Sequence, residues 1–153
     1  IMSFTHLHIH SDYSIHDSIL KVKDIVGTKE HKAIALTDDN NLFGAIKFYN
    51  GCRSNNMKPI IGSEINIKTP FGNDKMVFIS KNTNGYKNLM KMISLGYENR
   101  VTKDDQPYIT WQDLANLSTD LFVLSGGNGQ SPGASRFDHA GCYRLGFIGR
   151  RSV

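Results

Sequence analysis

The sequence predicts an α/β fold in which mostly parallel strands are joined by crossover helices. Two patterns alternate along the chain: short apolar runs typical of buried strands, and segments whose apolar residues recur at helical spacing. Their order is β-α-β-α-β-β-α-α-β, and strands that alternate with helices favour a parallel sheet. The chain has 153 residues, which is enough for one ordinary domain.

These patterns predict five strands and four helices. The strands are expected at 4–10, 33–37, 58–67, 75–80 and 121–124, and the three longer helices at 18–30, 42–54 and 83–95. A capping arrangement at 110–113 predicts a short fourth helix. Ser18 is the expected N-cap of the first helix, and Phe43, Ile46, Tyr49 and either Arg53 or Cys52 mark the turns of the second.

The composition excludes several classes of protein. Hydrophobic residues make up 39% of the chain and charged residues 21%, as in a soluble globular protein rather than a disordered one. We expect neither a membrane span nor a secretory signal, since no apolar run approaches ~20 residues and no basic segment opens the chain. Cys52 and Cys142 lie far apart without a CxxC spacing, which disfavours a disulfide scaffold and fits a reducing cytoplasm.

The chain divides by composition into a main part at 3–127 and an atypical Gly/Arg-rich tail at 128–153. From residue 126 onward it holds 7 of the 14 glycines and 4 of the 6 arginines, but none of the 12 lysines. The tail is either a natural flexible segment or a segment of different origin, such as a vector remnant or a shifted reading frame. Most of the net charge of +4 lies there, so we expect no direct DNA binding by the main part.

Three alternating histidines near the N-terminus are the most informative local feature. His6, His8 and His10 would project to one face of a strand, and imidazole is the commonest nitrogen ligand for zinc-type metals. The alternative is a histidine-rich strand with one edge in water. The predicted ends of the next strands carry Asp38, Asp39 and Glu64, so three strands would deliver ligand-type side chains to one rim. The alternative is that these are ordinary polar loop residues. That interpretation accounts for any one of the three strand ends, but less well for all three together.

Several longer motifs, taken in order, resemble those of a known family. They lie at 6–14 (HLHIHSDYS), 35–44 (ALTDDNNLFG), 48–49 (FY), 58–64 (KPIIGSE), 82–89 (NTNGYKNL) and 124–127 (LSGG). Together they resemble the N-terminal polymerase-and-histidinol-phosphatase (PHP) domain of bacterial DNA polymerase III alpha subunits, over about residues 3–127. The resemblance implies part of a distorted (β/α)7 barrel, similar to a TIM barrel, whose rim holds metal ions.

The resemblance also implies a set of ligands for a divalent metal, which would be zinc, manganese or magnesium. These are His8, His10, Asp17, Asp39 and Glu64. Asp39 stands where the family usually has histidine, and its oxygen makes a harder site that favours manganese or magnesium. Asn40 stands where the family usually has glycine. His16 offers a substitute nitrogen, and His6 and His16 are expected just behind the ligands.

The function implied by the resemblance is that of the N-terminal module of a replicative DNA-directed DNA polymerase in the cytoplasm. Such a module supports the polymerase core and docks the proofreading exonuclease among the other holoenzyme subunits, and it meets DNA through the rest of the protein. The remaining family ligands and the polymerase carboxylates would lie beyond residue 127, so we expect no catalytic residue and no activity in this chain alone. The alternatives are a free-standing metal-dependent PHP phosphoesterase resembling histidinol phosphatase, and a truncated product that does not fold stably.

Overall fold

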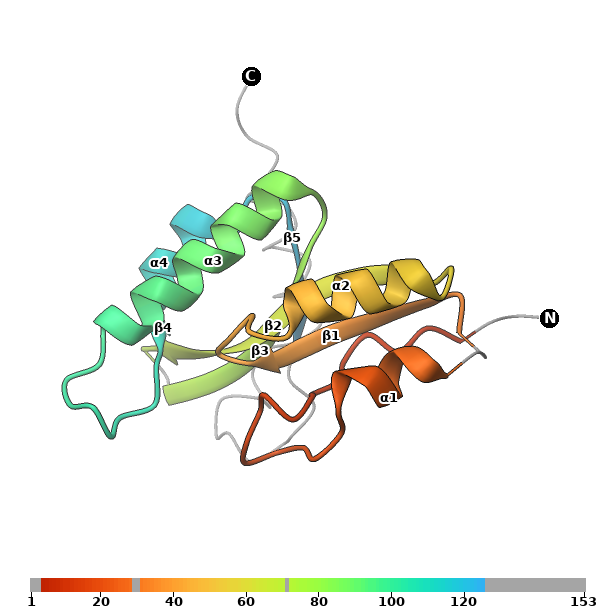
Figure 1. The fold of residues 1–153 in the computed structure, drawn as a ribbon. Coiled ribbons are helices and arrows are strands. Elements are labelled where there is room, and N and C mark those ends of the chain that lie inside the picture. Colours follow the sequence, from red (N-terminus) through yellow and green to blue (C-terminus); the bar gives the residue numbers. More distant parts are fainter. Residues whose placement is uncertain (1–3, 29–30, 71, 126–153) are drawn as a thin grey trace, which may run out of the picture.

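The computed structural model describes residues 4–28, 31–70 and 72–125, in which helices pack on a mixed five-stranded sheet (Figure 1). The strands are β1 (Ala33–Asp39), β2 (Lys58–Thr69), β3 (Gly72–Ser80), β4 (Ile109–Thr110) and β5 (Leu121–Ser125). Their order in the sheet is β1-β2-β3-β5, and β4 pairs with the far end of β2. The strands at 33–37, 58–67, 75–80 and 121–124 are therefore confirmed.

The pairing agrees with the predicted α/β class but makes the sheet mixed, because β3 alone runs opposite to the other four strands. β2 runs parallel to β1 and β4, but β3 is antiparallel to both β2 and β5. The reason is that β2 and β3 form a hairpin with a tight connection after Thr69, and a hairpin reverses the chain, whereas a parallel pairing needs a crossover. Within the described residues the sheet is open, so closure into a barrel stays a prediction.

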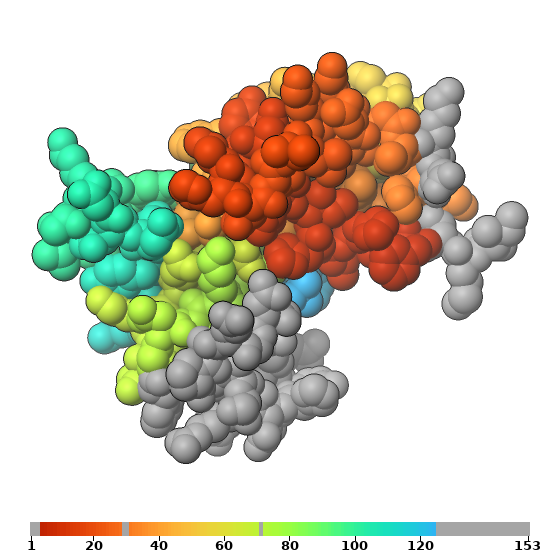
Figure 2. All heavy atoms as spheres, turned by 90° about the horizontal axis from the view of Figure 1, so that it is seen from below, coloured from red at the N-terminus to blue at the C-terminus, as the bar shows by residue number. Residues whose placement is uncertain are grey.

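The helices are α1 (Val22–Gly27), α2 (Ala45–Ser54), α3 (Thr83–Glu98) and α4 (Trp111–Leu117). α2 and α3 lie over the same face of the sheet, and α1 lies at the edge near β1 (Figure 1). Viewed from below, the N-terminal segment and α1, in red and orange, gather at one end, and residues near β4 lie at the other (Figure 2). None of the described helices is long and apolar enough to cross a membrane.

Two apolar cores lie on the helix-covered side. The larger one joins α3 and α4 to the middle of the sheet, with Phe78, Leu89 and Met92 completely buried. The smaller one joins α1 and α2 to β1, around Phe48 and Leu36. Burial of a large apolar side chain contributes roughly 1.5–3 kcal/mol, so these contacts fix where the strand ends lie.

The predicted strand at 4–10 does not form. Ala35 N–H donates to the His6 carbonyl at 2.9 Å and Thr37 N–H to the Ile9 carbonyl at 2.8 Å. The two donor residues are two positions apart in β1, whereas the two acceptor residues are three positions apart in the N-terminal segment. The N-terminal segment therefore has one extra residue between the two bonds, which breaks the pairing register. Ile9 N–H accordingly donates to the Thr37 hydroxyl at 3.1 Å. The segment runs along β1 without regular pairing, and strand alternation does not relate His6 to the later histidines.

The first two predicted helices begin too early in the sequence. α1 starts after Lys21, not Ser18, because Asp12 N–H donates to the Leu20 carbonyl and holds the preceding residues in a turn. Around α2, Phe43 and Ile46 are 74% and 73% exposed, so these two of the residues expected to mark its turns do not face the core, whereas Cys52 does. The buried residues of this helix are Ala45, Phe48 and Cys52. Apolar residues occur on both sides of α2, and packing against β1 and α1 selects one of them.

The later helices follow their sequence signals closely. α3 is capped by Asn82, whose side chain accepts from Gly85 N–H at 2.9 Å. α4 has the predicted capping box: the Thr110 hydroxyl accepts from Asp113 N–H, and the Asp113 carboxylate accepts from Thr110 N–H. Such local reciprocal bonds are legible from sequence because they involve residues three positions apart. The tail at 128–153 lies outside the described residues.

Candidate metal centre

Asp38, at the end of β1, anchors the segment that carries the histidines. Its carboxylate accepts from Ser11 N–H at 2.6 Å, from the Ser11 hydroxyl at 2.7 Å and from the Ser14 hydroxyl at 2.7 Å. All three side chains are buried. Charge-assisted bonds of this length are strong, and they fix the chain just after His10 against the sheet.

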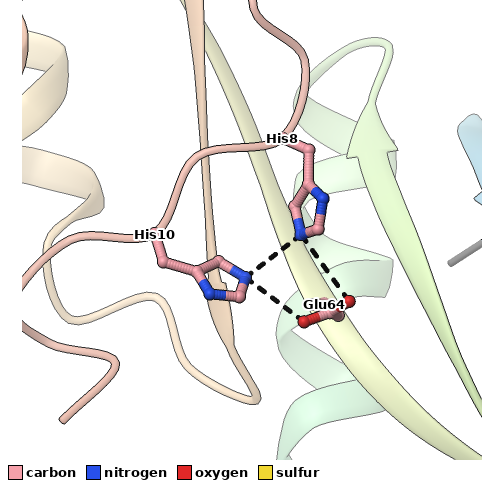
Figure 3. Close-up of side chains that lie close together, drawn as sticks. All are labelled: His8, His10 and Glu64. Atoms are coloured by element: carbon pink, nitrogen blue, oxygen red, sulfur yellow. Dashed lines mark hydrogen bonds and ion pairs between the residues drawn. The ribbon is translucent and has the colours of Figure 1, made fainter. Parts of the chain in front are cut away.

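His8, His10 and Glu64 converge beside this anchor (Figure 3). The two histidine Nε2 atoms lie 3.2 Å apart. Glu64 Oε2 lies 3.2 Å from His10 Nε2, and Glu64 Oε1 lies 3.6 Å from His8 Nε2. The histidines come from the N-terminal segment, whereas Glu64 projects from the middle of β2, opposite Asp39 in the parallel register. The ligand atoms all lie within 4.8 Å of one another.

The spacing of these three residues fits a small divalent cation. Ligands about 2.1 Å from a tetrahedral ion lie about 3.4 Å from one another. Here the two histidine Nε2 atoms are 3.2 Å apart, and each lies 3.2–3.6 Å from one of the two Glu64 oxygens. Two imidazoles and one carboxylate suit zinc and manganese. The His8 side chain is 46% exposed, which leaves the cluster open to solvent on that side. An ion held there would supply Lewis acidity toward a phosphoryl oxygen.

The contact between His10 and Glu64 shifts the pKa values of these two residues in opposite directions. The hydrogen bond to Glu64 raises the pKa of His10, and this effect outweighs the opposing effect of burial. Burial by itself would raise the pKa of Glu64, but the His10 hydrogen bond and the nearby positive charges, including the Lys75 ammonium, lower it overall. The lowered pKa favours the ionised carboxylate, which is the form that binds a cation.

Asp39 lies on the other side of Glu64 and is joined to it through Lys75. Lys75 Nζ is 3.3 Å from Asp39 Oδ1 and 3.5 Å from Glu64 Oε2. Burial raises the pKa of Asp39, and the Lys75 ammonium only partly offsets this. Burial alone would lower the pKa of Lys75, but the carboxylates of Asp39 and Glu64 raise it overall. The chain leaves β1 at Asn40 with φ of 51°, a left-handed conformation that suits asparagine or the glycine of the family pattern.

The other predicted site residues lie around the cluster rather than in it. Asp17 Oδ2 is 3.9 Å from His10 Nδ1, the ring nitrogen that faces away from Glu64. His16 is exposed in the same turn. His6 packs edge-on against Phe4 and His31, at 4.7 and 4.9 Å between ring centroids. A metal-ligating role for Asp17 and Asp39 stays a prediction.

Sequence patterns alone do not assign the positions of two further residues beside the cluster, Lys75 and Asp38. Lys75 would be found only by knowing the hairpin register, which pairs Asn66 with Lys75 and so places the lysine on the same face as Glu64. The sequence places Asp38 at a strand end but does not by itself predict that it anchors the N-terminal segment. The signal for it is the pair of serines at 11 and 14, whose hydroxyl groups are suited to a buried carboxylate.

Comparison with known proteins confirms the resemblance. Residues 6–145 match the PHP domain family. The chain is 38% identical over 130 residues to the DNA polymerase III subunit alpha of Buchnera aphidicola subsp. Acyrthosiphon pisum, and 35% identical over 130 residues to that of Escherichia coli K12. The corresponding Borreliella burgdorferi subunit is 42% identical over 123 residues. These matches cover 81%, 81% and 67% of this chain, which spans 11% of the length of each relative.

A solved structure supports the same fold. A Bifidobacterium adolescentis protein assigned as a metal-dependent phosphoesterase matches with a TM-score of 0.51 at 15% sequence identity. The match covers 63% of this chain and 34% of the other. Sequence and structure together lead to one conclusion: the chain belongs to the PHP domain family and is related to the PHP region of DNA polymerase III alpha subunits.

Proposed function

We propose that this chain is part of the PHP module of a replicative DNA polymerase III alpha subunit, acting in DNA replication in the cytoplasm. The supporting observation is its identity of 35–42% to such subunits over 123–130 residues. In this role the module supports the polymerase core and docks the proofreading exonuclease subunit. Its open sheet forms part of a distorted (β/α)7 barrel completed by further strands, and it contacts DNA through the rest of the protein.

We also propose that His8, His10 and Glu64 hold one divalent ion, with zinc and manganese as the best matches. The observation that carries this is their convergence within 4.8 Å from two separate segments of the chain. Asp17 orients the His10 ring from its opposite nitrogen, as carboxylates commonly do behind metal-ligating histidines. The ion stabilises the junction between the N-terminal segment and the sheet.

Calorimetric titration of the 153-residue chain with Mn²⁺ and with Zn²⁺ tests the metal site. The wild-type protein and His16→Ala should bind, because His16 is an exposed histidine outside the cluster. His10→Ala should lose binding at least tenfold. Equal affinity in wild type and His10→Ala would refute the site.

Two further measurements test the role in replication. The chain should co-elute in gel filtration with the proofreading exonuclease subunit of the same bacterium, and failure to do so at micromolar concentrations would refute docking by this region. In a primer-extension assay the chain alone should show no synthesis. Measurable extension would overturn the assignment of a non-catalytic module.

The second candidate function is a free-standing metal-dependent phosphoesterase. The likeness in fold to the Bifidobacterium adolescentis protein and the intact His8, His10 and Glu64 cluster favour it. Robust phosphatase turnover with Mn²⁺, abolished by His10→Ala, would support this function over the scaffold. We expect weak or absent turnover.

A further inference from the structure

Lys75 occupies an unusual place for a lysine, between two carboxylates at the candidate metal centre. Its position follows from the sheet: Asp39 is opposite Glu64 in the parallel β1–β2 pair, and Lys75 is opposite Asn66 in the antiparallel β2–β3 pair. Because cross-strand partners share a face, all three charged side chains project to the same side. The ammonium then lies 3.3 Å from Asp39 and 3.5 Å from Glu64.

Glu64 consequently serves two positive partners with one carboxylate. Its Oε1 faces His8 Nε2, and its Oε2 faces both His10 Nε2 and Lys75 Nζ. A carboxylate shared in this way resembles the bridging carboxylate of two-metal sites, whose ions lie ~3.5–4 Å apart. Here the histidine side offers nitrogen ligands for an ion, whereas the Asp39 side already holds an ammonium.

On the Asp39 side, one oxygen of each carboxylate already contacts the Lys75 ammonium. Asp39 Oδ1 contacts Lys75 and also accepts from the Asn40 side-chain amide at 2.7 Å. An ion bound between Asp39 and Glu64 would have to displace the ammonium, because two cations cannot share that position without strong repulsion. The histidine side carries no such competitor in the described structure.

We propose that the Lys75 ammonium takes the place of a second metal ion, so that this centre binds one divalent cation, at His8, His10 and Glu64. The inference rests on the proposed metal site. It assigns Asp39 to Lys75 rather than to the metal, and it explains how the chain carries an aspartate where the family pattern has a histidine ligand. Replacing Lys75 by a neutral residue should leave Asp39 and the Oε2 atom of Glu64 available to a second ion.

The test is a count of bound ions on the metal-stripped 153-residue chain equilibrated with excess Mn²⁺. Wild type should bind about one ion per chain by mass spectrometry and calorimetry, and Lys75→Met about two. The double variant Lys75→Met, Asp39→Asn should return to about one. Lys58→Met is the matched control and should bind about one, since Lys58 is an exposed lysine at the first residue of β2, the strand that carries Glu64.

Electron paramagnetic resonance gives a second readout that a purely structural lysine would not affect. Two Mn²⁺ ions bridged by Glu64 should give an exchange-coupled spectrum in Lys75→Met, whereas the wild type should give the spectrum of an isolated ion. Two ions in the wild type would overturn the inference, and this measurement does not depend on the folding of any variant. One ion in both proteins would overturn the inference while leaving the metal site standing. No ion in either would refute both.

Discussion

Asp38 binds Ser11 through both of its carboxylate oxygens, at 2.6 Å to the backbone N–H and 2.7 Å to the hydroxyl, across 27 positions of sequence. This pair joins the N-terminal segment to the end of β1. Since His10 immediately precedes Ser11, the pair also determines where the imidazole stands relative to Glu64. The geometry of the candidate metal centre therefore depends on a buried contact that includes none of its three candidate ligands.

Replacing Asp38 by asparagine should lower both stability and metal affinity. The amide removes the negative charge and turns an N–H group toward Ser11 and Ser14, whose groups also donate. We expect a loss of about 3 kcal/mol in the free energy of unfolding, and at least a tenfold loss of Mn²⁺ affinity. Urea denaturation and calorimetry measure the two effects. Asp12→Asn, at an exposed aspartate of the same segment, should change stability by less than about 0.5 kcal/mol; equal losses in both variants would contradict the anchoring role.

Bound metal should stabilise the folded chain. With Mn²⁺ at 100 times its dissociation constant, linkage adds about 2.7 kcal/mol to the free energy of unfolding, or about 5–10 °C in Tm. Differential scanning calorimetry of wild type with and without Mn²⁺ measures the shift. His8→Ala should show almost none of it, because the variant lacks one of the three ligands. A full shift in His8→Ala would exclude binding at this cluster.

The metal-free protein should lose the stability that His10 contributes as the pH rises above 6.5. The pKa of His10 is raised from 6.5, chiefly by its hydrogen bond to Glu64, so its contribution is complete below 6.5 and is lost as the pH rises through the raised value. The pKa of Glu64 is lowered from 4.5, despite the opposing effect of burial, because of His10 and nearby positive charges. Its contribution is present above 4.5 and is lost as the pH falls through the lowered value. The pair contributes most between these two reference values.

Urea denaturation of wild type and His10→Gln between pH 5.5 and 8.5, with a chelator present, checks this pH dependence. The stability advantage of wild type over the variant should shrink as the pH rises. Contributions of Asp39 and Lys75 are common to both proteins and largely cancel. A stability difference that stays constant across this range would show that Glu64 does not raise the pKa of His10 in the folded protein.

Gly62→Ala should disrupt the centre of the sheet. A Cβ atom at this position would meet the Phe78 carbonyl of β3 and lie 3.0 Å from Thr37 Cγ2 of β1. Both neighbours belong to paired strands, so we expect a loss of about 2–3 kcal/mol. Gly27→Ala is the control, because a Cβ there meets no atom within 4 Å, and it should stabilise by about 0.5 kcal/mol. Thermal unfolding distinguishes the two, and a stable Gly62→Ala protein would contradict the packing at this strand.

Local sequence signals predicted the parts of the fold that depend on local energies. The apolar run at 33–37 and the capping box at Thr110 reflect burial and hydrogen bonds within a few residues, and both are confirmed. The faces of α2 could not be read in the same way, since Phe43 and Ile46 are as apolar as the residues that become buried. Packing against α1 and β1 chose between the two faces.

The sequence by itself determined the family of this chain and three residues that meet at its candidate centre, because His8, His10 and Glu64 belong to motifs of fixed spacing. Only the tertiary structure decided how they meet. The broken register beside β1 separates His6 from the other histidines, and the β2–β3 hairpin brings Lys75 between Asp39 and Glu64. Both depend on pairing between distant segments, whose energies are set by contacts that no local pattern encodes.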